Sequence, residues 1–345
     1  KLAHNDDAQR GQQRDQHDPY RRRQPYKTVV DVAEQSGKGD EQRNQVERGN
    51  LQIHNDDYCN AASRAPQPVT VDNNGCILDC RTVSFSRSTR GVMHNATQST
   101  TDIRALARAL REAIEGDISF EPHALGIYAT DASLYQVTPV GLVCPKHAAD
   151  VIAAIRIAID HGVTILPRGG GTSLAGQAVG HSLVLDFSKH MTRILELNVE
   201  EKWVRVQPGI VHDELNAVLE PHGLLFAPDP ATTSRANIGG MMGNNTSGTK
   251  SILYGKTVDH VIELKVLLAD GTMLDLGPLS PAEYEAKSRG QSREAQIYRG
   301  FKQLIDIHRD EVRNRFPKVL RRVGGYNFDE FTNMDTWNLS KIMVG

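Results

Sequence analysis

The segment with the clearest chemical potential is Arg168–Ser173, whose sequence RGGGTS places three glycines between an arginine and two hydroxyl residues. Glycine tolerates positive φ and lets a ligand approach the backbone closely. Consecutive backbone N–H groups can then form a concave anion site, to which Arg168, Thr172 and Ser173 add donors. The segment therefore predicts a phosphate or pyrophosphate site. A sharp glycine turn without a ligand is the alternative interpretation.

The known phosphate loops do not fit this segment. A P-loop requires G-x4-G-K-[ST], and no lysine follows these glycines. A dinucleotide fingerprint requires G-x-G-x-x-G, but the sixth position counted from Gly169 is Leu174. We therefore exclude a standard ATP-binding or NAD-binding loop.

A second glycine-rich stretch runs from Phe226 to Thr257, with the sequence FAPDPATTSRANIGGMMGNNTSGTKSILYGKT. It is crowded with Gly, Asn, Ser and Thr, and Ile238, Met241 and Met242 are interleaved. A loop of this length without secondary structure is typically functional or disordered. A helix and a strand are predicted on either side, which favours function. Two such loops in one domain indicate a ligand that has both a pyrophosphate and a large flat group.

The elements that position these loops can be predicted from hydrophobic periodicity. Apolar residues at helical spacing predict helices at 99–114, 148–162 and 211–223, the last two of which end at a glycine. Short apolar runs predict strands at 141–145, 163–167, 182–187 and 202–209. Residues 260–277 are typical of two strands joined by an Asp-Gly hairpin turn. Helices and hairpins interleave without a uniform βαβ repeat, so the predicted fold class is α+β.

Residues 1–92 differ in composition from the rest of the chain. They are rich in Gln, Arg, Asp and Asn, have few apolar residues and show no period of 3.6 or 2. Such a segment cannot bury enough apolar surface to offset the entropy of ordering, so we expect low order. Two origins stay open: a disordered tail that has a partner, or upstream DNA translated beyond the true start, because Met93 begins a well-patterned sequence.

Charge, hydropathy and cysteine content exclude several classes of protein. The net charge is −2, which argues against nucleic acid as the main partner. No apolar run approaches the roughly 20 residues of a membrane helix, and the polar N-terminus predicts no signal peptide. Four scattered cysteines suit a reducing compartment. We expect a cytoplasmic protein, and peripheral attachment to the inner membrane is compatible with this expectation.

Side chains that bind metals or act as catalytic bases form no clear constellation. Cys76 and Cys80, with His54 and Cys59 nearby, could be interpreted as a zinc site. The spacing is not C-x2-C and no ordered frame supports it, so we expect no metal. The remaining histidines considered are His123, His147, His161, His212, His222 and His260. They are scattered, so we name no catalytic residue.

Together the two loops resemble the FAD-binding domain of the vanillyl-alcohol oxidase type, also called the PCMH-type fold. Within it, they are most similar to FAD-linked oxidases that act on D-2-hydroxy acids. The resemblance is carried by PRGGGTSLAGQ from Pro167, PDPATTSRANIGGMMGNNTSGTKSILYGKTVDHV from Pro228, and the strand that ends LADG at Gly271. It implies an FAD-binding core of two α/β subdomains at residues 139–277. A helical lead-in at 93–138 would precede it, and a helical insertion with an incomplete end of the FAD domain would follow at 278–345.

The resemblance also implies which residues contact FAD. The pyrophosphate would be held by Arg168, Gly169, Gly170, Gly171, Thr172 and Ser173, with Gly176 and Gln177 close behind. The rest of the dinucleotide would be lined by Pro228, Asp229, Thr233, Gly239, Gly240, Asn244, Ser247 and Gly248, with Tyr254 and Gly255 near the same wall. The strand with Val261 and Ile262 would pass the adenine side. For each residue, plain packing or turn formation is the alternative.

Two departures from the family pattern limit what the resemblance implies. Members that attach flavin covalently often have His where this chain has Thr172, so the resemblance implies non-covalent FAD. The sequence RRVGGYNFDEF at Arg321–Phe331 resembles the approach to the segment that completes the FAD domain. The completing strand, the substrate domain with its catalytic His and metal ligands, and any iron–sulfur centre would therefore lie in a missing C-terminal part. The cysteines present show no iron–sulfur spacing.

The activity implied is oxidation of a small D-2-hydroxy acid, such as D-lactate, glycolate or D-2-hydroxyglutarate, by hydride transfer to flavin. The electron acceptor is not assigned. The alternative is a non-catalytic FAD-binding fragment that lacks the substrate domain.

Overall fold

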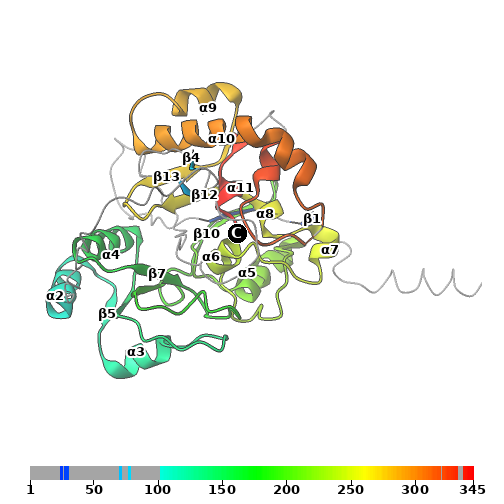
Figure 1. The fold of residues 1–345 in the computed structure, drawn as a ribbon. Helices are drawn as coiled ribbons and strands as arrows, with labels where there is room; N and C mark the ends of the chain where they lie inside the picture. The colour runs from blue at the N-terminus through cyan, green and yellow to red at the C-terminus, as the bar shows by residue number, and fades with distance from the viewer. Residues whose placement is uncertain are drawn as a thin grey trace, which may run out of the picture.

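The computed structural model describes residues 102–319, 321–332 and 337–345, together with four short strands nearer the N-terminus (Figure 1). These strands are β1 (Gln24–Pro25), β2 (Lys27–Val30), β3 (Thr70–Val71) and β4 (Ile77–Leu78). Apart from these strands, residues 1–92 lie outside the described residues, so their expected low order stays a prediction. The cysteines and the histidine of the zinc interpretation, Cys59, Cys76, Cys80 and His54, also lie outside them.

The first of two main sheets has four strands in the order β5-β6-β8-β7. Its members are β5 (Asp117–Ser119), β6 (Gly141–Cys144), β7 (Ile165–Arg168) and β8 (Leu183–Asp186). Only the edge strand β5 is antiparallel to its neighbour. Helices α2 (Ile103–Ala113) and α4 (Ala148–Asp160) cover one face, and α3 (Pro122–Tyr128) covers the other (Figure 1). The sheet is therefore buried on both faces, as its apolar strands require.

Local signals in the sequence explain where these helices begin and end. The side chain of Asp102 accepts hydrogen bonds from the N–H groups of Arg104 and Ala105 and so caps α2. Imidazole Nδ1 of His147 accepts a hydrogen bond from the N–H of Asp150 at the start of α4. After α4, Gly162 has φ +64°, the left-handed conformation that commonly ends a helix.

The second main sheet has five strands in the order β13-β12-β2-β10-β9. Besides β2, they are β9 (Ile194–Asn198), β10 (Trp203–Val206), β12 (Val261–Leu267) and β13 (Met273–Leu276). Strand β2 runs parallel to both β10 and β12. The β12–β13 hairpin contains the predicted Asp-Gly pair, and Gly271 has φ +81° there.

Helices pack around the second sheet, with α9 and α10 next to β12 and β13 (Figure 1). The helices are α5 (His212–Leu219), α6 (Ile238–Gly243), α7 (Ser251–Tyr254), α8 (Thr257–His260), α9 (Pro281–Lys287), α10 (Arg293–Arg315) and α11 (Ser340–Met343). Short connecting elements are η2 (Glu220–His222), β11 (Leu224–Leu225), β14 (Pro278–Leu279), η3 (Phe328–Phe331) and β15 (Trp337–Asn338). An aromatic group of Tyr284, Tyr298 and Trp337 anchors α9 and α10, with ring centroids 4.6 and 5.0 Å from Tyr284.

The mixed helix-and-strand architecture expected from the sequence is confirmed, with two kinds of difference. Strands β2, β5 and β9 and helix α3 are among the elements that have no matching prediction. The stretch 226–257 was expected to lack secondary structure, and this is wrong because it contains α6, α7 and α8. Burial of Ile238, Met241 and Met242 in the second core holds α6 in a helix despite its three glycines, since packing outweighs intrinsic propensity in short helices.

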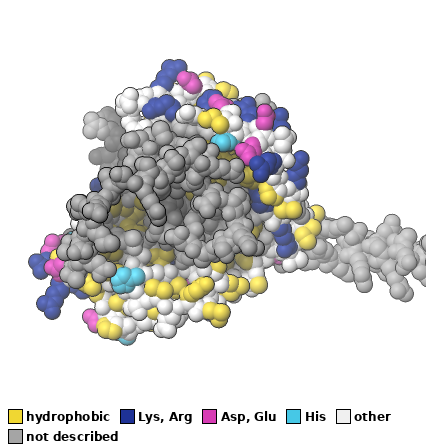
Figure 2. All heavy atoms as spheres, in the orientation of Figure 1, with side chains coloured by type: hydrophobic (Ala, Val, Ile, Leu, Met, Phe, Trp, Pro, Cys, Tyr) yellow, Lys and Arg dark blue, Asp and Glu magenta, His cyan; other side chains and the backbone are white. Residues whose placement is uncertain are grey.

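The surface of the described residues carries both signs of charge. Lys and Arg side chains are interspersed with Asp and Glu along the upper edge of the face shown in Figure 2. Hydrophobic side chains appear along the lower edge of that face, on the side where α3 lies. Among the described helices, none has the length and apolar character needed to cross a bilayer.

Candidate functional site

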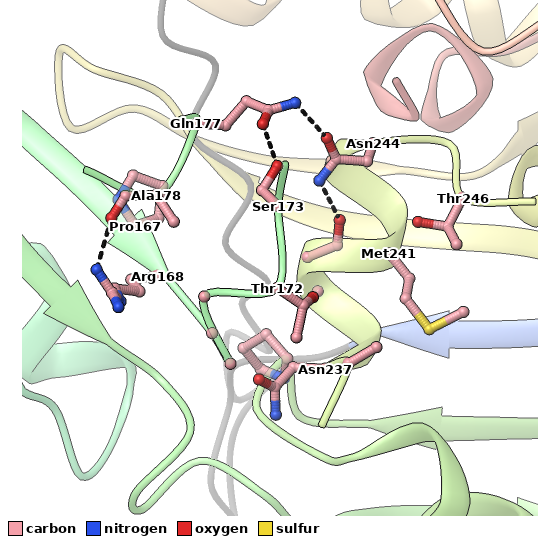
Figure 3. A pocket seen from close by; sticks show the side chains of 18 of the residues that line it. Pro167, Arg168, Thr172, Ser173, Gln177, Ala178, Asn237, Met241, Asn244 and Thr246 are labelled. Carbon is pink, nitrogen blue, oxygen red and sulfur yellow. Dashed lines mark hydrogen bonds between the residues drawn. The ribbon is translucent and has the colours of Figure 1, made fainter. Parts of the chain in front are cut away.

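A cavity of about 650 Å3 lies where the end of β7 faces α6 (Figure 3). Ligand pockets typically have volumes of about 300–1,000 Å3. One wall is formed by residues 166–173, which leave the first sheet at β7. The opposite wall is formed chiefly by residues 236–246, which include α6 of the second half of the molecule. A ligand in this cavity would therefore contact both halves at once.

The glycines of the loop let the two walls approach each other. A Cβ atom on Gly170 would lie 2.2 Å from the carbonyl oxygen of Arg235. One on Gly169 would lie 2.6 Å from Oδ1 of Asn237. Gly171 has φ +63°, a conformation that favours glycine. The three glycines thus have structural reasons to be glycine, and their backbone remains the surface that faces the cavity.

The guanidinium group of Arg168 holds a neighbouring loop in place. Nη1 donates to the carbonyl oxygens of Tyr128 at 3.0 Å and Ala178 at 2.8 Å. Nη2 donates to the carbonyl oxygen of Thr130 at 2.7 Å. Burial lowers the pKa of Arg168 from its ordinary value. Arg168 lines the cavity, but three of its N–H groups bond to the backbone, and its contact with a pyrophosphate stays a prediction.

A row of polar side chains crosses the first sheet beside this loop. Cys144 lies opposite Asp117 in the β5–β6 pair, and Arg168 lies opposite Asp186 in the β7–β8 pair. The hydroxyl of Tyr128, on α3, donates to Oδ2 of Asp186 at 2.6 Å. Burial is the main cause that raises the pKa of Tyr128 above its ordinary value. This hydrogen bond joins α3 to the edge of the sheet from which the glycine loop departs.

Amide side chains bridge the two walls of the cavity (Figure 3). Nε2 of Gln177 donates to Oδ1 of Asn244 at 3.1 Å, and Nδ2 of Asn244 donates to the carbonyl oxygen of Gly240 at 3.0 Å. The hydroxyl of Ser173 donates to Oε1 of Gln177. The bridge joins the loop after β7 to α6 through groups that can donate and accept.

The cavity lining is nearly free of ionisable side chains. Arg168 is the single Lys, Arg, Asp, Glu or His residue among the described residues that form it. Backbone N–H groups, hydroxyls and amides make up its polar surface. Such a lining suits the binding of an extended polar or anionic ligand, but it offers no group for proton transfer within the described walls.

Half of the residues predicted to contact a cofactor line this cavity. They are Arg168, Gly169, Gly170, Gly171, Thr172, Ser173, Gln177, Gly239, Gly240 and Asn244. The others lie outside the lining: Gly176, Pro228, Asp229, Thr233, Ser247, Gly248, Tyr254, Gly255, Val261 and Ile262. Several of these have structural partners. For example, Oδ1 of Asp229 accepts a hydrogen bond from the N–H of Lys250, and the hydroxyl of Thr233 donates to Asp213. Cofactor contact stays a prediction for the whole set.

The lining also contains residues that were not predicted. They are Leu166, Pro167, Ala178, Phe187, Pro208, Pro230, Thr232, Ala236, Asn237, Met241, Gly243, Thr246, Val323, Gly325 and Gly345. Most of them lie within or next to the two glycine-rich stretches, so their position in the sequence could have pointed to them. Gly345 is brought in from far along the chain, and its N–H donates to the carbonyl oxygen of Met242 at 2.9 Å.

The buried histidines serve the fold. Imidazole Nε2 of His212 lies 3.1 Å from the carbonyl oxygen of Phe226, and Nε2 of His260 lies 2.9 Å from that of Tyr254. Neither lines the cavity. Within the described part of the chain, no group of three or more His, Cys, Asp or Glu residues could hold a metal ion.

Comparison with known proteins finds one family match within the chain and several relatives. Residues 139–277 match the family model described as an FAD binding domain. D-2-hydroxyglutarate dehydrogenase of Pseudomonas putida is 40% identical over 245 residues, which cover 69% of this chain and 24% of that protein. Glycolate oxidase subunit GlcD of Bacillus subtilis is 35% identical over 169 residues, 48% of this chain and 36% of that protein. The chain thus spans about a quarter to a third of the length of these relatives.

Among solved structures, an alkyldihydroxyacetonephosphate synthase aligns over 56% of this chain and 37% of its own, at 21% identity and with a TM-score of 0.47. The family match at residues 139–277 includes the glycine loop and the α6 segment that form the two walls of the cavity. The resemblance to FAD-linked oxidases is confirmed, and residues 139–277 match the FAD binding domain family.

Proposed function

We propose that the cavity between β7 and α6 binds FAD without a covalent bond, and that the chain is the flavin-binding part of an oxidoreductase that oxidises a D-2-hydroxy acid. The observation that carries the proposal is the position of the cavity. Its two walls are the two glycine-rich stretches of the matched FAD binding domain, and they face each other across about 650 Å3.

The groups that face the cavity suit a dinucleotide. The backbone of Gly169–Gly171 is bare toward the cavity, as a pyrophosphate requires, and Thr172 and Ser173 add hydroxyl donors next to it. The amide pair Gln177 and Asn244 can bond to the sugar-alcohol chain or the ring edges. We assign to Arg168 the positioning of this loop through its carbonyl partners.

Non-covalent binding is favoured by the composition of the walls. No histidine, cysteine or tyrosine is present among the described residues that line the cavity. These walls therefore lack a nucleophilic side chain of the kind that forms a bond to a flavin ring. In this proposal, residues 139–277 form the two subdomains of the FAD-binding core. Residues 278–345 form a helical insertion and the incomplete end of the FAD domain.

The substrate class is suggested by the relatives. Their names concern D-2-hydroxyglutarate and glycolate, which share a hydroxyl group on the carbon next to a carboxylate. Bound flavin would supply the hydride acceptor for such an alcohol. The chain's own residues would bind and orient the dinucleotide. Because the cavity lining offers no carboxylate or imidazole, we place the base that accepts the hydroxyl proton outside these walls.

The same lack of a base favours a second candidate, an FAD-binding fragment without catalytic activity. A turnover assay distinguishes the oxidoreductase from the non-catalytic fragment. The full chain, loaded with FAD and freed of excess cofactor, is mixed with D-2-hydroxyglutarate, D-lactate or glycolate and an electron-accepting dye. Dye reduction that depends on both substrate and FAD supports the oxidoreductase. Retained FAD with no reduction for any of the three acids supports the fragment and refutes the activity of this chain.

A further inference from the structure

The centre of the second main sheet is formed by a strand from the N-terminal part of the chain. Strand β2 (Lys27–Val30) lies between β10 and β12 and runs parallel to both of them. Each of its four residues is in register with a residue of β10, from Trp203 to Val206. Its last three residues are also in register with residues of β12. Strand β2 is therefore paired on both sides, as a central strand is.

Strands β10 and β12 cannot replace β2 by pairing with each other. Neighbouring strands lie about 4.8 Å apart, so two strands on either side of a third lie about twice that distance apart. Both strands contribute to the second core, in which Val204, Val206, Val261 and Leu264 are buried. Without β2, their facing edges would carry unpaired N–H and C=O groups in the middle of the sheet, which is costly. The gap between β10 and β12 therefore requires a strand.

The same N-terminal segment holds both ends of the stretch that forms the second wall of the cavity. Strand β1 pairs in parallel with β11, and Pro25 is in register with Leu225. Thr28 is in register with Val261, the first residue of β12. The glycine-rich stretch 226–257, which supplies most of that wall, runs between β11 and β12. Strands β1 and β2 thus fix where this stretch begins and where it ends.

We infer that the gap between β10 and β12 is a binding site for an extended peptide segment, and that residues 24–30 are its occupant. Such a site derives its affinity from main-chain hydrogen bonds to the strands beside it. The sequence KTVV at Lys27–Val30 has three β-branched residues, which favour an extended backbone. A segment far outside the matched residues 139–277 thus completes the sheet that supports them.

The first test is urea unfolding of the full chain with Val29→Pro. Proline has no N–H to donate, and in a strand paired on both sides every N–H faces a neighbour. Val71→Pro is the matched control, because it makes the same substitution in β3, which pairs with β4 in a separate two-stranded sheet. We expect Val29→Pro to lower the urea midpoint well below that of Val71→Pro. Equal midpoints would overturn the inference.

The second test asks whether the gap binds a free strand. A fluorescent peptide with the sequence of residues 22–32, RRQPYKTVVDV, is titrated into the full chain that carries Val29→Pro. We expect saturable binding by fluorescence anisotropy and recovery of the urea midpoint, whereas the same peptide with Val29→Pro should do neither. No binding of the unchanged peptide would overturn the inference. Should the proline variant not fold, Val29→Gly and its control Val71→Gly take its place, because glycine weakens a strand interior and keeps the N–H.

Neither readout involves FAD, so these results are independent of the proposed function. The effect of the segment on the cavity wall rests on that function and is measured by FAD retention after gel filtration. Val29→Pro should lose FAD that the wild-type chain and Val71→Pro retain, and the added peptide should restore it. Full FAD retention by Val29→Pro at a lowered urea midpoint would overturn the role of the segment in holding the wall.

Discussion

Replacement of Gly170 by alanine should damage the cavity through a single carbon atom. The new Cβ would lie 2.2 Å from the carbonyl oxygen of Arg235, whereas real Cβ atoms essentially never come within 3.0 Å of such a neighbour. Arg235 contributes backbone here, so no side-chain rotation can relieve the contact. The loop after β7 and the segment before α6 must move apart. Overpacking of this kind typically costs about 1–3 kcal/mol.

The same movement separates the two walls of the cavity, so we expect Gly170→Ala to bind FAD at least about tenfold more weakly, the equivalent of 1.4 kcal/mol. Gly126→Ala is the matched control, because nothing lies within 4 Å of its Cβ position in α3. Alanine there should stabilise the chain by up to about 1 kcal/mol. Urea unfolding and FAD titration measure both effects. Unchanged stability and FAD affinity in Gly170→Ala would refute the close approach of the two walls.

Three further predictions concern the polar row on the first sheet. Tyr128→Phe removes the donor to Asp186 and should cost about 1.5 kcal/mol in urea unfolding; no loss would refute this tie. A hydrogen bond from Lys189 lowers the pKa of Asp117 below 3.8, so the stability it adds is present above pH 3.8 and is lost as the pH falls through the lower folded pKa. Asp117→Asn should therefore flatten the acid dependence of the urea midpoint, and an unchanged profile counts against the pairing. Burial raises the pKa of Cys144 to about 11, so alkylation at pH 8, mapped by peptide mass, should reach Cys144 only after unfolding; rapid labelling of the native chain would contradict its burial.

The parts of the fold that follow a single period could be predicted from the sequence. The helix over 148–160 and the strand over 141–144 lie where apolar spacing places them. Gly162 follows the end of α4, and Gly223 follows the short helix η2 after α5; both glycines adopt positive φ. Such signals are local, so no knowledge of the tertiary fold is needed to interpret them.

The elements without a prediction depend on tertiary contacts. Burial does not alternate along strand β9, in which only the central residue is exposed; the strand is defined by its pairing with β10. Helix α6 contains three glycines in six residues and is held by buried Ile238 and Met241. Neither can be recognised before the partner surface is known.

The candidate site likewise has residues that the sequence could predict and residues that depend on tertiary contacts. The glycine loop is visible in the sequence because only close approach or positive φ requires three glycines in a row. Asn237 has an ordinary sequence context, and only its buried, unpaired oxygen distinguishes it. Likewise, Gly345 joins the wall through a hydrogen bond to Met242, about a hundred residues earlier in the chain. Contacts across such distances leave no signal in the spacing of residues.

The most direct test of the account is the visible spectrum of the purified chain after incubation with FAD and gel filtration. We predict a flavin absorption band that elutes with the folded protein and is released completely by acid, which would show both binding and the lack of a covalent bond. A folded chain that elutes without the band would contradict the assignment of the cavity to FAD. A band that stays with the acid-precipitated protein would contradict non-covalent binding.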